Sequence, residues 1–107
     1  MIGIGTWQTS VNAMLFKGDI TIVVSNKDGV YDIDFQLPDK FKDVKIRTYD
    51  IVEDGNTLRG KGEVTMLPGK ELEAEVTFTS DTTFEGVLNI PFLKRSLPLK
   101  NGHKISD

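Results

Sequence analysis

The amino-acid sequence predicts an all-β fold, an antiparallel up-and-down β-barrel of about eight strands. Apolar and polar residues alternate almost without a break over residues 20–99, which is the period of a strand with one buried face. Glycine, proline, asparagine and aspartate interrupt the alternation at short intervals, as expected of hairpin turns. Closure of such a sheet removes its exposed edges, but the pattern is also compatible with an open barrel or a β-sandwich.

Length and composition indicate one folded domain over residues 1–107. The chain is 38% hydrophobic and 27% charged, which is ordinary for a globular protein of this size. Its net charge of −3 argues against a nucleic acid as partner, because phosphate binding needs a continuous basic face. No apolar run is long enough to span a membrane and no signal peptide is recognisable, so we expect a cytoplasmic protein without a membrane partner.

The first strand is expected around residues 4–9. Residues 11–16 fit either a helical turn or a loop that caps one end of the barrel, and their pattern does not decide between them. The next two strands form a hairpin, in which facing residues must lie on the same side of the sheet. Pairing Val24 with Tyr31 satisfies this rule and leaves Asn26-Lys27-Asp28-Gly29 as the turn.

The middle of the chain is expected to contain an irregular strand. Leu37-Pro38-Asp39-Lys40 ends the preceding strand, because proline removes a ladder donor. A new strand begins near Asp43, and a bulge near Thr48 would turn Tyr49 and Ile51 toward the interior. The Asp54-Gly55 turn then aligns Tyr49 with Gly60 and Ile51 with Leu58.

The later strands each show one inward row at every second residue. These rows are Leu58 to Met66, Leu72 to Phe78 and Phe84 to Ile90, separated by turns at Pro68-Gly69 and Ser80-Asp81-Thr82. Pairing Phe78 with Phe84 keeps apolar residues opposite one another. The outward residues Glu71, Glu73 and Glu75 are expected to face Arg59 and Lys61, and a last strand is expected around residues 96–100.

The start of the chain resembles a known family. Gly5-Thr6-Trp7 is similar to the Gly-X-Trp signature of lipocalins, and with the meander it resembles a small calycin, the group of lipocalins, fatty-acid-binding proteins and avidins. The resemblance implies that Trp7 plugs the closed end of a barrel. It also implies that a basic side chain from the last strand packs across Trp7, and Arg95 is the late arginine that the resemblance assigns to this role.

Three of the inward positions are glycines, Gly60, Gly62 and Gly86. The missing side chains either leave a cavity or are covered by neighbouring aromatic rings. An eight-stranded barrel is wide enough for one small ligand, and the two tyrosine hydroxyls would be available for hydrogen bonds. The candidate ligand-binding residues are Trp7, Tyr31, Phe35, Tyr49, Leu58, Gly60, Val64, Phe78, Phe84 and Leu88.

We therefore expect non-catalytic binding of a small apolar or amphipathic ligand in the barrel interior. The alternative is a structural or protein-interaction module with a filled core, either homodimeric or docking a partner on the outer sheet face. The sequence leaves the oligomeric state open.

The residue inventory gives little support to catalysis. There is no cysteine, and the single histidine, His103, has no partner for a metal site or a nucleophile, so we expect no catalytic residue, metal or cofactor. Asp32 and Asp34 share an outer face but lack the further oxygen ligands that a hard cation needs. A pair of catalytic carboxylates would leave no sequence signature, which keeps a small hydrolase or isomerase as a third alternative.

Overall fold

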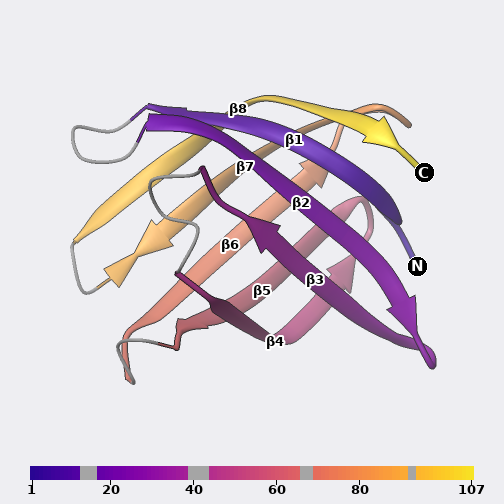
Figure 1. Cartoon of the computed structure of the whole chain (residues 1–107). Coiled ribbons are helices and arrows are strands. Elements are labelled where there is room, and N and C mark those ends of the chain that lie inside the picture. Colours follow the sequence, from indigo (N-terminus) through magenta and orange to yellow (C-terminus); the bar gives the residue numbers. More distant parts are fainter. Residues whose placement is uncertain (13–16, 39–43, 66–68, 92–93) are drawn as a thin grey trace.

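The fold is an antiparallel eight-stranded barrel, which confirms the predicted fold class (Figure 1). The computed structural model describes residues 1–12, 17–38, 44–65, 69–91 and 94–107. Its strands follow one another up and down, in the order β3-β2-β1-β8-β7-β6-β5-β4 around the sheet. Their bounds are β1 (Gly5–Asn12), β2 (Lys17–Lys27), β3 (Val30–Gln36), β4 (Ile46–Asp54), β5 (Thr57–Val64), β6 (Glu71–Phe78), β7 (Thr83–Ile90) and β8 (Arg95–Ser106).

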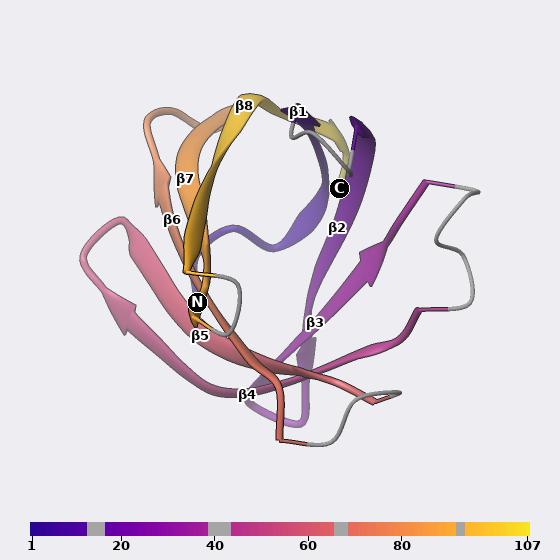
Figure 2. The ribbon, with the colours of Figure 1, turned by 90° about the vertical axis from the view of Figure 1, so that its left-hand side faces the viewer.

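The barrel closes between its first and last strands and remains open between β3 and β4. β1 pairs with β8, whereas the described parts of β3 and β4 share no backbone ladder. Two side-chain hydrogen bonds join them: Thr48 Oγ1 donates to the carbonyl of Ile33 at 3.1 Å, and the Tyr31 hydroxyl donates to the Glu53 carboxylate. Figure 2 shows the strands as a ring in which β3 and β4 diverge toward the end of β3 and the start of β4. The barrel is therefore nearly closed, with a seam at β3 and β4.

The β2–β3 hairpin corrects the predicted register by two residues. Val24 pairs with Ile33, and Asn26 pairs with Tyr31, so the predicted pairing of Val24 with Tyr31 is wrong. Asp28 and Gly29 form a two-residue turn with φ angles of 55° and 84°. Positive φ at both central residues is typical of the hairpin turn whose twist matches that of the strands, and this favours the shorter loop. Because side chains alternate with a period of two, a register shift of two residues leaves the same side chains of β2 and β3 on the inward face.

The bulge in β4 lies later than predicted. The register of β4 on β5 shifts between Tyr49 and Val52, and Asp50 has a φ of 51°. Tyr49 therefore pairs with Lys61, so the predicted alignments of Tyr49 with Gly60 and Ile51 with Leu58 are wrong. The extra residue at the bulge returns Ile51 to the inward side and leaves Tyr49 on the outer one.

The pairing of β5, β6 and β7 agrees with the sequence. Phe78 pairs with Phe84 and Ala74 with Leu88, as the parity of the strands predicted. On the outer face Arg59 pairs with Glu75 and binds its carboxylate at 3.1 Å. Four expectations fall outside the described residues: the inward position of Met66, the turn at Pro68, the strand start near Asp43, and the structure of residues 13–16.

The hydrophobic core lies where the inward rows of β1, β2, β7 and β8 meet. Its buried residues are Trp7, Val11, Ile20, Ile22, Val24, Phe84 and Leu99. Thr9 is fully buried beside this core, on β1. The β1–β8 ladder is irregular there, because Gln8 pairs with His103 and Ser10 with Lys100. The Thr9 hydroxyl donates to the carbonyl of Lys100 at 2.8 Å and so satisfies an acceptor at the irregularity.

Candidate functional site

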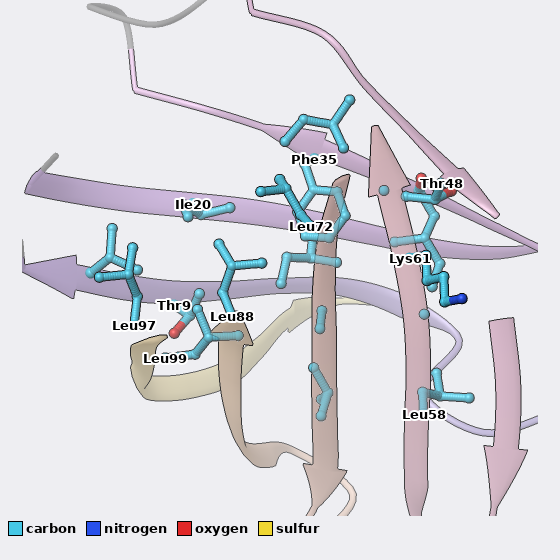
Figure 3. A pocket seen from close by; sticks show the side chains of 18 of the residues that line it. Thr9, Ile20, Phe35, Thr48, Leu58, Lys61, Leu72, Leu88, Leu97 and Leu99 are labelled. Atoms are coloured by element: carbon cyan, nitrogen blue, oxygen red, sulfur yellow. Dashed lines mark hydrogen bonds between the residues drawn. The ribbon is translucent and has the colours of Figure 1, made fainter. Parts of the chain in front are cut away.

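The barrel interior contains an apolar cavity of about 790 Å³. Residues from all eight strands line it, and most of these side chains are aliphatic or aromatic. Figure 3 shows apolar side chains from several strands directed into the same space. The cavity is therefore formed by the inward rows that the alternating pattern predicted.

One end of the cavity is closed by aromatic rings. Trp7 and Phe78 lie with ring centroids 5.0 Å apart, and Phe84 lies 5.6 Å from Trp7 and 6.3 Å from Phe78. The chain before β1 crosses beside them, since Trp7 Nε1 donates to the carbonyl of Gly3 at 2.8 Å. A Cβ atom on Gly3 would lie 2.2 Å from the Phe78 ring, so only glycine fits this close approach. We call this aromatic end the closed end.

The opposite end, where β8 begins, is the mouth. Arg95 belongs to the inward row of β8 with Leu97 and Leu99 and is exposed to solvent, so this end of the barrel interior is open to solvent. Leu37 and Val44 line the cavity on either side of the segment that joins β3 to β4.

The basic residue that packs against Trp7 is Lys104, which corrects the assignment of Arg95 to this role. Lys104 pairs with Trp7 across the β1–β8 ladder, and its ammonium nitrogen lies 5.7 Å from the centroid of the Trp7 ring. Arg95 lies at the other end of β8, where it reaches the mouth. The expectation considered arginine alone, whereas a lysine ammonium makes the same cation–π contact.

Eight of the ten candidate ligand-binding residues line the cavity. Two do not, Tyr31 and Tyr49. The eight are Trp7, Phe35, Leu58, Gly60, Val64, Phe78, Phe84 and Leu88.

Tyr31 packs against the core at the closed end. Its hydroxyl accepts a hydrogen bond from the backbone N–H of Ile2 at 2.7 Å and donates to the Glu53 carboxylate. Desolvation raises the pKa of Tyr31, and the hydrogen bond to Glu53 raises it further. The phenol therefore bridges the N-terminal segment and the β3–β4 seam.

Tyr49 lies on the outer face of β4, so the prediction that it faces the interior is wrong. The Arg47 guanidinium carbon lies 4.9 Å from the centroid of its ring. Desolvation raises the pKa of Tyr49, followed by its hydrogen bond to Glu71. Since neither tyrosine lines the cavity, no phenol hydroxyl is available to a ligand there.

The inward glycines of β5 are packed against isoleucines, not aromatic rings. A Cβ atom on Gly60 would lie 3.3 Å from Ile51 Cγ1, and one on Gly62 would lie 2.9 Å from Ile46 Cγ2. Both glycines also line the cavity, so the β5 backbone forms part of its wall. The glycines thus contribute both to the packing of β4 on β5 and to the open space.

Sequence reasoning missed several lining residues, among them Thr9, Thr48 and Arg95. Thr9 and Thr48 donate their hydroxyl protons to backbone carbonyls. Arg95 belongs to the same every-second-residue row as Leu97 and Leu99, which also line the cavity. That row is visible in the sequence and could have placed Arg95 on the inward side.

The described residues give no sign of a metal centre, because nowhere do three or more acidic or histidine side chains gather closely enough to hold an ion. No helix long and apolar enough to span a membrane occurs in the described ranges. Comparison with family models, curated proteins and solved structures finds no match to this chain. The geometry of the cavity is therefore the basis for a functional conclusion.

Proposed function

We propose that the barrel binds one small apolar or amphipathic molecule in its interior, without catalysing a reaction. The observation that carries this proposal is the cavity of about 790 Å³ lined mainly by apolar side chains. Its volume lies within the roughly 300–1,000 Å³ typical of small-molecule sites. A filled core, which the alternative of a pure interaction module requires, would leave no such space.

Burial of apolar surface supplies the binding energy. Each methylene group moved from water into the cavity contributes about 0.8 kcal/mol, which is roughly a fourfold gain in affinity. The Thr9 and Thr48 hydroxyls already donate to the backbone, so they offer a ligand only acceptor positions. The wall is thus suited to an aliphatic or aromatic body with few polar groups.

We propose further that this barrel is related to the calycins. Three features support it: the Gly5-Thr6-Trp7 triplet at the start of β1, the place of Trp7 at the closed end, and the packing of Lys104 across the Trp7 ring. The order of the strands supports it as well, because β1 and β8 pair to close an up-and-down barrel.

The test uses an unbranched series of neutral primary alcohols and the Ala74→Phe variant. Ala74 lines the cavity at the middle of β6, so a phenyl ring there occupies ligand space. In the matched control, Glu73→Phe, the same ring is placed on the neighbouring, exposed position of the same strand. Titration calorimetry should show affinity rising about fourfold per methylene for the wild type and for Glu73→Phe. Ala74→Phe should fold and bind much more weakly.

Two results would contradict the proposal. One is the absence of binding along the whole alcohol series. The other is equal affinity of Ala74→Phe and Glu73→Phe for the longest soluble alcohol. Native mass spectrometry of the purified wild type adds an independent readout, because a retained natural ligand appears as extra mass that denaturation removes.

A further inference from the structure

The outer face of the barrel has an open hollow of about 550 Å³ where β8 bulges against β7. The pairing of the two strands shifts between Phe84 and Gly86, so the single residue Glu85 of β7 faces both Lys100 and Asn101 of β8. An extra residue of this kind bends a strand and re-aims its side chains, and bulges are frequent next to active sites.

The floor of the hollow is formed by backbone. Phe84 and Leu99 line both the hollow and the cavity, and their side chains belong to inward rows, so it is their backbone that reaches the outer face. A Cβ atom on Gly102 would lie 2.6 Å from the carbonyl oxygen of Phe84, which shows how closely the two strands approach. Asn101 has a φ of 55°, and its carbonyl accepts a hydrogen bond from His103 Nδ1 at 2.6 Å. These contacts fix the shape of the bulge.

The wall of the hollow carries one charge of each sign. Glu85 and Lys100 are the charged residues among the described ones that line it, and both are exposed. Asn101 adds an amide group, and the hydroxyl oxygens of Thr79 and Thr83 lie 2.7 Å apart. Because a hydroxyl oxygen has two acceptor positions, this pair is able to accept a further hydrogen bond beside the carboxylate.

Glu85 and Lys100 face neutral partners on the neighbouring strands. Glu85 pairs with Thr77 of β6, and Lys100 pairs with Ser10 of β1. Asp19, on the strand beyond, accepts a hydrogen bond from the Ser10 hydroxyl. The ion pairs of the described ranges include neither Glu85 nor Lys100. Both charges are therefore available to a ligand.

The segments outside the described ranges do not alter this charge balance. Among them only residues 39–43 contain charged side chains. These residues follow β3 and precede β4, which are the two ends of the strand order, whereas β7 and β8 stand in its middle. Figure 2 shows β7 and the seam between β3 and β4 on opposite sides of the ring.

We propose that this hollow binds a small zwitterion, a molecule with one ammonium and one carboxylate group. The ligand's ammonium group donates to the Glu85 carboxylate and to the Thr83 hydroxyl, and its carboxylate accepts from the Lys100 ammonium. Glu85 repels a simple anion and Lys100 repels a simple cation, so a molecule that carries both charges suits the pair best. The inference is independent of the proposed function, because the hollow and the cavity lie on opposite faces of the sheet.

The experiment titrates the unbranched ω-amino acids, from glycine to 6-aminohexanoate, into the isotope-labelled protein. The readout is the NMR signals of the backbone amides of Gly86 and Gly102, which lie at the hollow. One chain length should match the spacing of the two charges and bind most tightly, with a dissociation constant on the order of millimolar, as expected of exposed ion pairs. Acetate and methylammonium, which each carry one of the two charges, should bind about threefold more weakly or less.

Four variants test the residues. Glu85→Gln and Lys100→Gln should each weaken the binding of the preferred amino acid about threefold. The matched controls, Glu73→Gln and Lys61→Gln, remove the same charges from exposed positions of β6 and β5 and should leave the affinity unchanged.

Three results would overturn the proposal. The first is the absence of saturable shifts at Gly86 and Gly102 for every amino acid of the series. The second is acetate or methylammonium binding as tightly as the preferred amino acid, which indicates contact with a single charge. The third is an equal loss of affinity in all four variants. Losses confined to Glu85→Gln and Lys100→Gln, with added salt weakening the binding to the wild type, would support it.

Discussion

Lys104 and Trp7 face each other across the strands that close the barrel. They are paired residues of the β1–β8 ladder, and the Lys104 ammonium lies 5.7 Å from the Trp7 ring centroid. The contact joins the start of the first strand to the end of the last one. The same pair of side chains therefore contributes both to the contact between β1 and β8 and to the aromatic closed end.

Replacing Lys104 with methionine should lower the free energy of unfolding by about 0.5–1 kcal/mol, because the apolar stem is kept and the cation–π contact is lost. The ion pair of Lys104 with Asp107 contributes little, since the Asp107 side chain is 97% exposed. Urea denaturation followed by the fluorescence of Trp7, the single tryptophan, gives the measurement. Lys100→Met is the control, and an equal loss in both variants would contradict the contact.

The stability of the protein should depend on the hydroxyl group of Thr9. Thr9→Val keeps the shape of the side chain but removes the donor to the Lys100 carbonyl. An unsatisfied buried acceptor costs about 1–3 kcal/mol, and since this hydrogen bond is only partly buried we expect a loss of stability near the lower end of that range. Thr21→Val, on the outer face of β2, should change the free energy of unfolding by less than half as much in the same denaturation experiment.

Gly29 should be required for its backbone conformation alone. Its φ is +84°, and a Cβ atom there would meet nothing within 4 Å, so substitution creates no clash with another residue. Gly29→Ala should lower the free energy of unfolding by about 1–2 kcal/mol, the usual cost of a left-handed conformation. Gly29→Asn should cost less, because asparagine tolerates this region. Equal costs for the two variants would contradict the two-residue turn.

Ionisation of Tyr31 should destabilise the protein in alkaline solution. Desolvation and the hydrogen bond to Glu53 raise the pKa of Tyr31 above its ordinary value of 10.0. The unfolded chain therefore releases this proton first. The stabilising contribution is complete below pH 10 and is lost as the pH rises through the pKa of the folded state.

In Tyr31→Phe the free energy of unfolding should fall less steeply with pH when it is measured from about pH 9 to pH 11. Tyr49, whose pKa is also raised, remains in the variant and leaves a residual slope of the same sign. Tyr49→Phe is the comparison, and an unchanged slope in Tyr31→Phe would show that Tyr31 is not desolvated as described.

Much of the candidate site could be predicted from residue parity. The rows of β6 and β7 were placed correctly because alternation is a local property, and Phe78 with Phe84 left one consistent pairing. The positions of Tyr31 and Tyr49 relative to the cavity could not be predicted from parity. Tyr31 has the expected parity, but its distance along β3 places it at the closed end, beside Glu53.

By itself, the sequence determined the fold class, the number of strands and most of the inward rows, because these follow from alternation and turn residues along the chain. Only the tertiary structure decided the bulge at Asp50, the seam between β3 and β4, and the opposite positions of Lys104 and Arg95. The physical reason is that a bulge at any one of several neighbouring residues would produce the same change of side-chain parity along β4, so the pattern does not fix its position. Contacts between strands far apart in sequence, such as that of Lys104 with Trp7, arise only when the barrel closes.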